Sequence, residues 1–215
     1  MSHEHEVRHL SEVDRRKFLQ LSSFATALVF VNSILSLESA AALPSAKLPG
    51  FTAFAKSVKV FKSGKYYLVE SNGIPAHQMM VGIKSWQQQV PTIQNYAGTN
   101  AWSIPIKPVI ATNPISAKDH FLRGAIAIAV NGVPIFNALN NRGDDALLAG
   151  ELDDWGGHCG RADDYHYHIA PTHLQSVVGK KVPIAYALDG FPIYGETEID
   201  GKKVTALDGF NGHFD

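Results

Sequence analysis

The chain has 215 residues, of which 45% are hydrophobic and only 18% charged, so it can build a substantial core and is not a disordered tail protein. Nineteen lysines and arginines against 20 aspartates and glutamates give a formal net charge of -1. This balance excludes nucleic acid as an expected partner, because no excess of cations can replace phosphate counterions. One cysteine excludes an internal disulfide and any multi-cysteine metal site, whereas ten histidines are unusual.

The first 42 residues have the three parts of an export signal. Arg15 and Arg16 stand before a mostly apolar run at 21–37, and three alanines at 40–42 offer a cleavage site. The arginine pair, followed shortly by Phe-Leu, resembles a twin-arginine signal. We therefore predict a twin-arginine signal peptide over residues 1–42. Its partner would be the twin-arginine export machinery, and the mature protein would be periplasmic or secreted.

The same apolar run could instead be a transmembrane anchor. It is 17 residues long and contains four serines, a threonine and an asparagine, whereas a spanning helix needs about 20 mostly apolar residues. We therefore expect no stable membrane anchor after cleavage, and a mature domain over residues 43–215. Three histidines should then leave with the signal, namely His3, His5 and His9.

Asn-Gly or Asp-Gly pairs between apolar runs predict an all-β fold. Such pairs occur within the segments 66–75, 125–136 and 184–194, and they are the strongest short-range signal for a β-hairpin. A proline three residues after each Asn or Asp cannot donate to a ladder, so each second strand should lie at an edge or a bulge. Helical periodicity is weak. The prediction is a hairpin-rich sandwich or barrel with little helix.

The second and third hairpins match each other at an offset of 58 residues, which predicts an internal duplication. Each is followed by a Gly-His pair, at 157–158 and at 212–213. The first copy continues to Tyr-His-Tyr-His at 165–168, whereas the sequence stops where a second copy would have it. We therefore expect the domain to be truncated at its C-terminus.

Four histidines are candidate metal ligands. Side chains alternate along a strand, so His166 and His168 should share one face, about 6.7 Å apart, with the two tyrosines on the other. His158 follows two glycines in a loop that can fold back over this strand, and His213 is its counterpart in the repeat. Imidazole is a common ligand of transition metals, so we predict a divalent ion: copper, zinc or iron.

The alternative for these histidines is hydrogen bonding to buried carbonyl groups. Packing is about as plausible as ligation for His77, and we expect His120 and His173 to lie on the surface. Further candidate ligands near the Gly-His pair are Cys159, Asp163 and Asp164. No Ser or Asn pattern around the cysteine completes a nucleophilic set, and no catalytic residue is assigned.

The motif set resembles the YHYH-domain proteins. It consists of Tyr-His-Tyr-His at 165–168, the preceding Gly-His-Cys-Gly at 157–160 and the following Asp-Gly-Phe-Pro-Ile-Tyr-Gly at 189–195, and the likeness spans residues 71–215. The resemblance implies export and a histidine-rich site, but no particular reaction. Members of the family commonly carry a second Tyr-His-Tyr-His after an Asn-Gly-His element. Here the Asn-Gly-His element at 211–213 stands almost at the end of the sequence, in line with the expected truncation.

Three functions follow from these patterns. The preferred one is an exported histidine-rich metal-binding protein, which as an enzyme would be a metal-dependent oxidoreductase or hydrolase with an open coordination position. The alternative is a non-catalytic extracytoplasmic module for glycan or protein, with tyrosines and tryptophans lining a groove. The third is a structural β-domain without a ligand.

Overall fold

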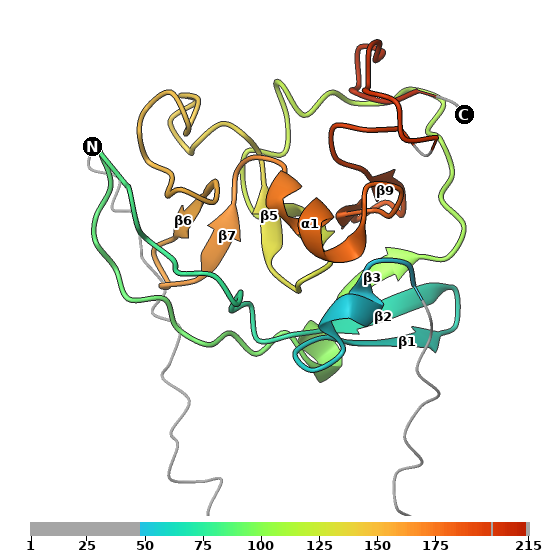
Figure 1. Ribbon diagram of the computed structural model, residues 1–215, viewed down its shortest axis with the longest axis horizontal. Coiled ribbons are helices and arrows are strands. Elements are labelled where there is room, and N and C mark those ends of the chain that lie inside the picture. The colour runs from blue at the N-terminus through green and yellow to red at the C-terminus, as the bar shows by residue number, and fades with distance from the viewer. Residues whose placement is uncertain (1–47, 199, 214–215) are drawn as a thin grey trace, which may run out of the picture. The chain divides into compact units, whose positions relative to one another are not determined.

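Strands make up most of the regular structure in a computed structural model that describes residues 48–198 and 200–213 (Figure 1). Within these residues the one α-helix is α1 (Gln175–Val178), besides three short 3₁₀ turns, and no helix is long and apolar enough to cross a membrane. The all-β prediction with little helix is confirmed. The predicted signal peptide over 1–42 lies outside the described residues.

The first sheet has three antiparallel strands in the order β1-β2-β3, which are β1 (Lys59–Ser63), β2 (Tyr66–Glu70) and β3 (Trp102–Pro105). The β1–β2 turn passes through Gly64, whose φ is +56°. The hairpin predicted over 66–75 is wrong. The Asn72 side chain accepts a hydrogen bond from the Ile74 backbone N–H (3.1 Å) and turns the chain, but no returning strand pairs with β2 there.

The second sheet has six strands in the order β6-β7-β5-β4-β8-β9. The parallel pair is β5 with β7, and the other pairs are antiparallel. In chain order the strands are β4 (Ala125–Ala129), β5 (Pro134–Phe136), β6 (Gly157–Cys159), β7 (Tyr165–Tyr167), β8 (Ala185–Ala187) and β9 (Pro192–Ile193). The hairpins predicted over 125–136 and 184–194 are therefore present as β4–β5 and β8–β9.

Both hairpins use the same three-residue turn. In the first, the Gly132 N–H donates to the Ala129 carbonyl (2.8 Å), and the Ala129 N–H donates to the Val133 carbonyl (2.9 Å). The second hairpin repeats both bonds 58 residues later. Only the glycines have a positive φ, +83° at Gly132 and +103° at Gly190, as in a type I turn followed by a left-handed glycine. In both Asn-Gly and Asp-Gly it is therefore the glycine that supplies the conformation which the turn requires.

The two copies of the hairpin pair with each other through β4 and β8. Ile128 lies opposite its own repeat equivalent, Tyr186, and the flanking alanines exchange partners across this point. This register is that of a local two-fold axis, which supports the predicted duplication. The proline of the second copy lies in the edge strand β9, whereas the first lies in the interior strand β5, whose pairing with β4 contains a register shift.

Side chains from both sheets form one hydrophobic core, as in a β-sandwich. Val69 of β2 and Ile104 of β3 contribute to it from the first sheet, and Ile128 of β4 from the second. The Ser71 hydroxyl donates to the Gly132 carbonyl (2.6 Å), and a Cβ at Gly132 would lie 2.5 Å from that of Ser71. The hairpin turn therefore needs glycine for close approach as well as for its φ.

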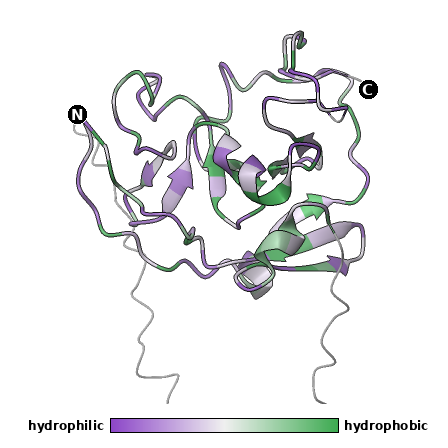
Figure 2. Cartoon of the chain, in the orientation of Figure 1, coloured by the Kyte–Doolittle hydropathy of each residue, from purple (hydrophilic) through white to green (hydrophobic). Residues whose placement is uncertain are grey.

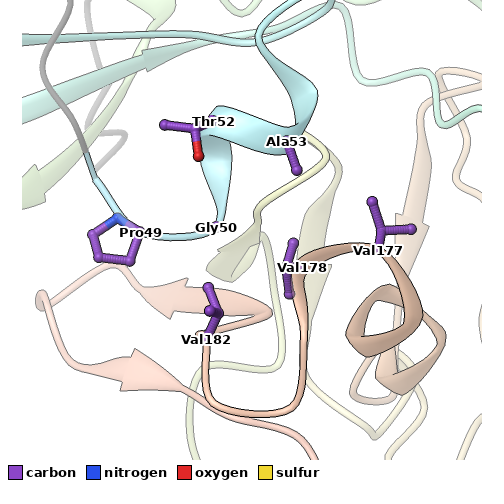
Figure 3. A pocket seen from close by; sticks show the side chains of 7 residues that line it. All are labelled: Pro49, Gly50, Thr52, Ala53, Val177, Val178 and Val182. Carbon is purple, nitrogen blue, oxygen red and sulfur yellow. The ribbon is translucent and has the colours of Figure 1, made fainter.

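A cavity of about 360 Å³ between the 3₁₀ turn at Phe51–Phe54 and the α1 region is lined by apolar residues and Thr52 (Figure 3). The strands β6 and β7 are instead the hydrophilic part of the second sheet (Figure 2), although every residue in them is buried. Burial of polar side chains is costly without partners, so this end of the sheet is where a functional site is expected.

Candidate metal centre

Three histidines meet on one face of the β6–β7 pair. His158 of β6 lies directly opposite His166 of β7, and His168 follows at the end of β7 on the same side. The ring centroids are 5.0 Å apart for His158–His166, 4.8 Å for His158–His168 and 5.0 Å for His166–His168. One nitrogen from each ring lies within 4.8 Å of the others. All three residues are buried, with 4% of His158, 4% of His166 and 7% of His168 exposed to solvent. We call these residues the triad.

Strand geometry explains this convergence. The predicted alternation is confirmed, because His166 and His168 project from one side of β7 while the two tyrosines project from the other. His158 was expected in a loop, but it lies in a strand. Directly opposite residues of antiparallel strands project to the same face, so the pairing itself brings His158 to His166.

Backbone carbonyl groups hold each ring by its Nδ1 atom. The acceptors are Glu151 for His158 (2.9 Å), Asp164 for His166 (3.0 Å) and Asn137 for His168 (2.5 Å). A carbonyl oxygen only accepts, so each Nδ1 carries the hydrogen and each Nε2 keeps a lone pair. The alternative function of these histidines, hydrogen bonding to buried carbonyl groups, thus accounts for the three Nδ1 atoms. It leaves the three Nε2 atoms without a proton.

The Nε2 atoms of His158 and His168 lie 3.1 Å apart. With both lone pairs exposed to each other, no hydrogen lies between them and the contact is repulsive. Two ligands of one tetrahedral ion, each about 2.05 Å from it, would be about 3.3 Å apart. The separation therefore fits two nitrogens that share a cation.

Burial keeps the triad neutral. It lowers the pKa of His158 to about 4 and that of His166 to about 3, and repulsion from the neighbouring rings adds to both shifts. The pKa of His168 is also lowered, chiefly by burial. At pH 7 all three imidazoles are consequently in the unprotonated form that a metal requires.

Two aromatic rings cover the triad. Trp86 stacks on His158 with ring centroids 4.7 Å apart, and Phe136 stacks on His166 at 3.9 Å. The Trp86 Nε1–H also donates to the Cys159 carbonyl (2.9 Å), which fixes the indole against β6. The two rings therefore pack directly against two members of the triad.

A buried carboxylate supports the His158 anchor. Glu151 is 3% exposed, accepts hydrogen bonds from the Asn140 amide (3.2 and 3.3 Å) and pairs with the Arg142 guanidinium. Its side chain is thereby fixed while its carbonyl holds the imidazole. Hydrogen bonds to the far nitrogen of an imidazole fix the orientation of the ring, which a metal ligand requires.

The other predicted ligands lie elsewhere. His213 is not part of the triad; its Nε2 is 2.8 Å from the Glu198 carboxylate. Cys159 is fully buried and the pKa of its thiol is raised to about 12, mainly by burial, which disfavours a thiolate. The Asp164 carboxylate lies 3.8 Å from Nδ1 of His166, on the carbonyl side of the ring.

Two further expectations concern isolated histidines. His120 is exposed, as predicted. The surface prediction for His173 is wrong, because this ring is half-buried and lies 4.9 Å from Trp155, between ring centroids. His77 contacts the same tryptophan, on which it stacks with ring centroids 4.8 Å apart.

The comparisons with known proteins identify one family. The family model described as "YHYH protein" matches residues 101–210, just over half of the 215-residue chain. The matched region contains all six strands of the second sheet and the whole triad, but neither His77 nor His213. No significant match was found among the curated proteins or the solved structures.

Proposed function

The chain belongs to the YHYH protein family, and from its geometry we propose that it binds a divalent transition metal through His158, His166 and His168. One observation carries the proposal. Three Nδ1 atoms are held by carbonyl groups, so three unprotonated Nε2 atoms are left in a buried cluster, two of them 3.1 Å apart. A cation relieves this repulsion.

The donor set indicates which ions fit. The group contains no carboxylate or thiolate among the described residues, and three neutral imidazoles suit zinc, copper or iron. Three protein ligands are also the number that catalytic zinc sites use to keep one position open. In its catalytic form the proposal is a metal-dependent oxidoreductase or hydrolase, with Trp86 and Phe136 packed against two of the ligands.

The test is metal binding by the untagged protein. Replacing His166 and His168 by alanine should remove the high-affinity equivalent of Zn²⁺ or Cu²⁺ and weaken binding at this site at least about 100-fold, because only one imidazole remains. Elemental analysis after dialysis gives the stoichiometry, and competition with a chelator gives the affinity. His120→Ala is the matched control, since it removes an exposed histidine outside the triad.

A contrary result is equally definite. If wild-type protein folds without metal and its melting temperature does not change on adding Zn²⁺ or Cu²⁺, the triad is no metal site, because a ligand of the native state must stabilise it. The non-catalytic module for glycan or protein would then be the better account.

We also propose export by the twin-arginine machinery to a periplasmic or secreted location, which the sequence pattern over 1–42 supports. Changing Arg15 and Arg16 together to lysine keeps the charge and should abolish export, with the full-length precursor retained in the cytoplasm. Cell fractionation and immunoblotting measure this, and Arg8→Lys is the control outside the pair. Unchanged export of the double variant would indicate another route.

A further inference from the structure

Two histidines outside the triad pack against the tyrosine side of β7. His77 and His173 are 96 residues apart in sequence, yet their ring centroids are 5.2 Å apart and nearly perpendicular. Both rings contact Trp155 and Tyr167. Two imidazoles that share one tetrahedral ion have centroids about 5 Å apart, and the triad itself shows 4.8 to 5.0 Å.

The Nε2 atoms of the two rings differ in their hydrogen-bond partners. The His77 Nδ1–H donates to the Gln78 carbonyl (2.8 Å), so Nε2 keeps a lone pair and accepts the hydroxyl hydrogen of Tyr167 (2.7 Å). The His173 Nε2 atom is buried and has no hydrogen-bond partner in the part of the chain that the structure describes. An orphaned buried nitrogen of this kind requires an explanation, and an absent ion is one.

A buried carboxylate lies close to the two rings. Asp153 is 6% exposed and accepts hydrogen bonds from the Tyr165 hydroxyl and from three backbone N–H groups. Within the described residues it forms no salt bridge, so its negative charge has no compensating cation. Burial lowers the pKa of both His77 and His173, and the negative charge of Asp153 only partly opposes this, so both rings are neutral at pH 7 with a carboxylate nearby.

We propose that His77 and His173 form a second site for a zinc or copper ion, separate from the triad. The ion takes the lone pair of His77 Nε2 that accepts the Tyr167 hydroxyl hydrogen in the metal-free protein, and the hydroxyl oxygen released from this hydrogen bond is the adjacent oxygen donor. Neutral imidazole nitrogen suits these ions, and solvent completes the coordination sphere on the side where Trp155 is 36% exposed. β7 then separates two metal sites, with His166 facing one and its two tyrosines facing the other.

Zn²⁺ titration of the full chain tests this site independently of the triad. The protein carries no tag, and His3, His5 and His9 are replaced by alanine to exclude binding by the N-terminal histidines. Calorimetry at pH 7 should show about two equivalents in this background, about one in His77→Ala/His173→Ala and about one in His166→Ala/His168→Ala. His120→Ala should leave two.

The possible outcomes are distinct. One equivalent in the background protein that persists in His77→Ala/His173→Ala overturns the second site. One equivalent in His166→Ala/His168→Ala together with none in His77→Ala/His173→Ala supports the second site and refutes the triad. If the His77/His173 variant does not fold, His173→Asn alone must lose the second equivalent. This single change keeps the backbone and removes a ring whose Nε2 atom has no hydrogen-bond partner among the described residues.

Discussion

Metal-free protein is expected to lose stability steeply as the pH falls from 7 to 4. The pKa of His158 is lowered from its ordinary value of 6.5 to about 4, and that of His166 to about 3, chiefly by burial. Because the folded-state values lie below the unfolded one, the stabilising contribution is complete above pH 6.5 and disappears as the pH falls through the folded values. For His158 this amounts to roughly 3 kcal/mol.

Urea unfolding at several pH values in the presence of EDTA measures this effect. A variant with His158 and His166 replaced by glutamine keeps polar side chains of similar reach and removes both titrations, so its stability should change less between pH 7 and pH 4. The difference between the two proteins isolates the histidines from carboxylates that titrate in the same range. Parallel stability curves for both would show that the imidazoles are not buried as described.

Local turn signals predicted three hairpins, of which two are present and the one over 66–75 is absent, for the same physical reason. At Gly132 and Gly190 the left-handed conformation that glycine permits falls between two adjacent strands. At Gly73 the same signal turns the chain, but the partners of β2 come from β1 and from β3, more than 30 residues on. A turn motif reports the local backbone, whereas strand pairing depends on the apolar surface available elsewhere.

The triad was accessible from sequence because alternation along a strand is a property of the backbone. The groups that surround the triad could not be predicted from the sequence. The acceptor atoms at Asn137 and Glu151 are backbone carbonyls, which any residue type carries, so no letter in the sequence marks them. The stacking of Trp86 on His158 and the contact of His77 with Tyr167 bring together residues 72 and 90 positions apart, which only the folded sheet establishes.

Asp153→Ala is expected to cause the largest loss of stability from a single substitution, about 3 to 5 kcal/mol. The carboxylate accepts hydrogen bonds from the backbone N–H groups of Met80 (3.0 Å), Trp155 (2.9 Å) and Gly157 (3.1 Å), and from the Tyr165 hydroxyl (2.8 Å). Alanine leaves donors without a partner beside the start of β6. Chemical denaturation at pH 7 compares the variant with wild type.

Two neighbouring substitutions separate the causes of this loss. Asp154→Ala removes an adjacent, exposed carboxylate and should change stability by less than about 0.5 kcal/mol. Asp153→Asn preserves the shape and one acceptor oxygen, but its NH₂ group faces donors, so it should fall between wild type and alanine. If both Asp153 variants are as stable as wild type, the carboxylate does not organise the Gly157 end of β6. Because β6 places His158 opposite His166, loss of metal binding in Asp153→Ala should accompany its loss of stability.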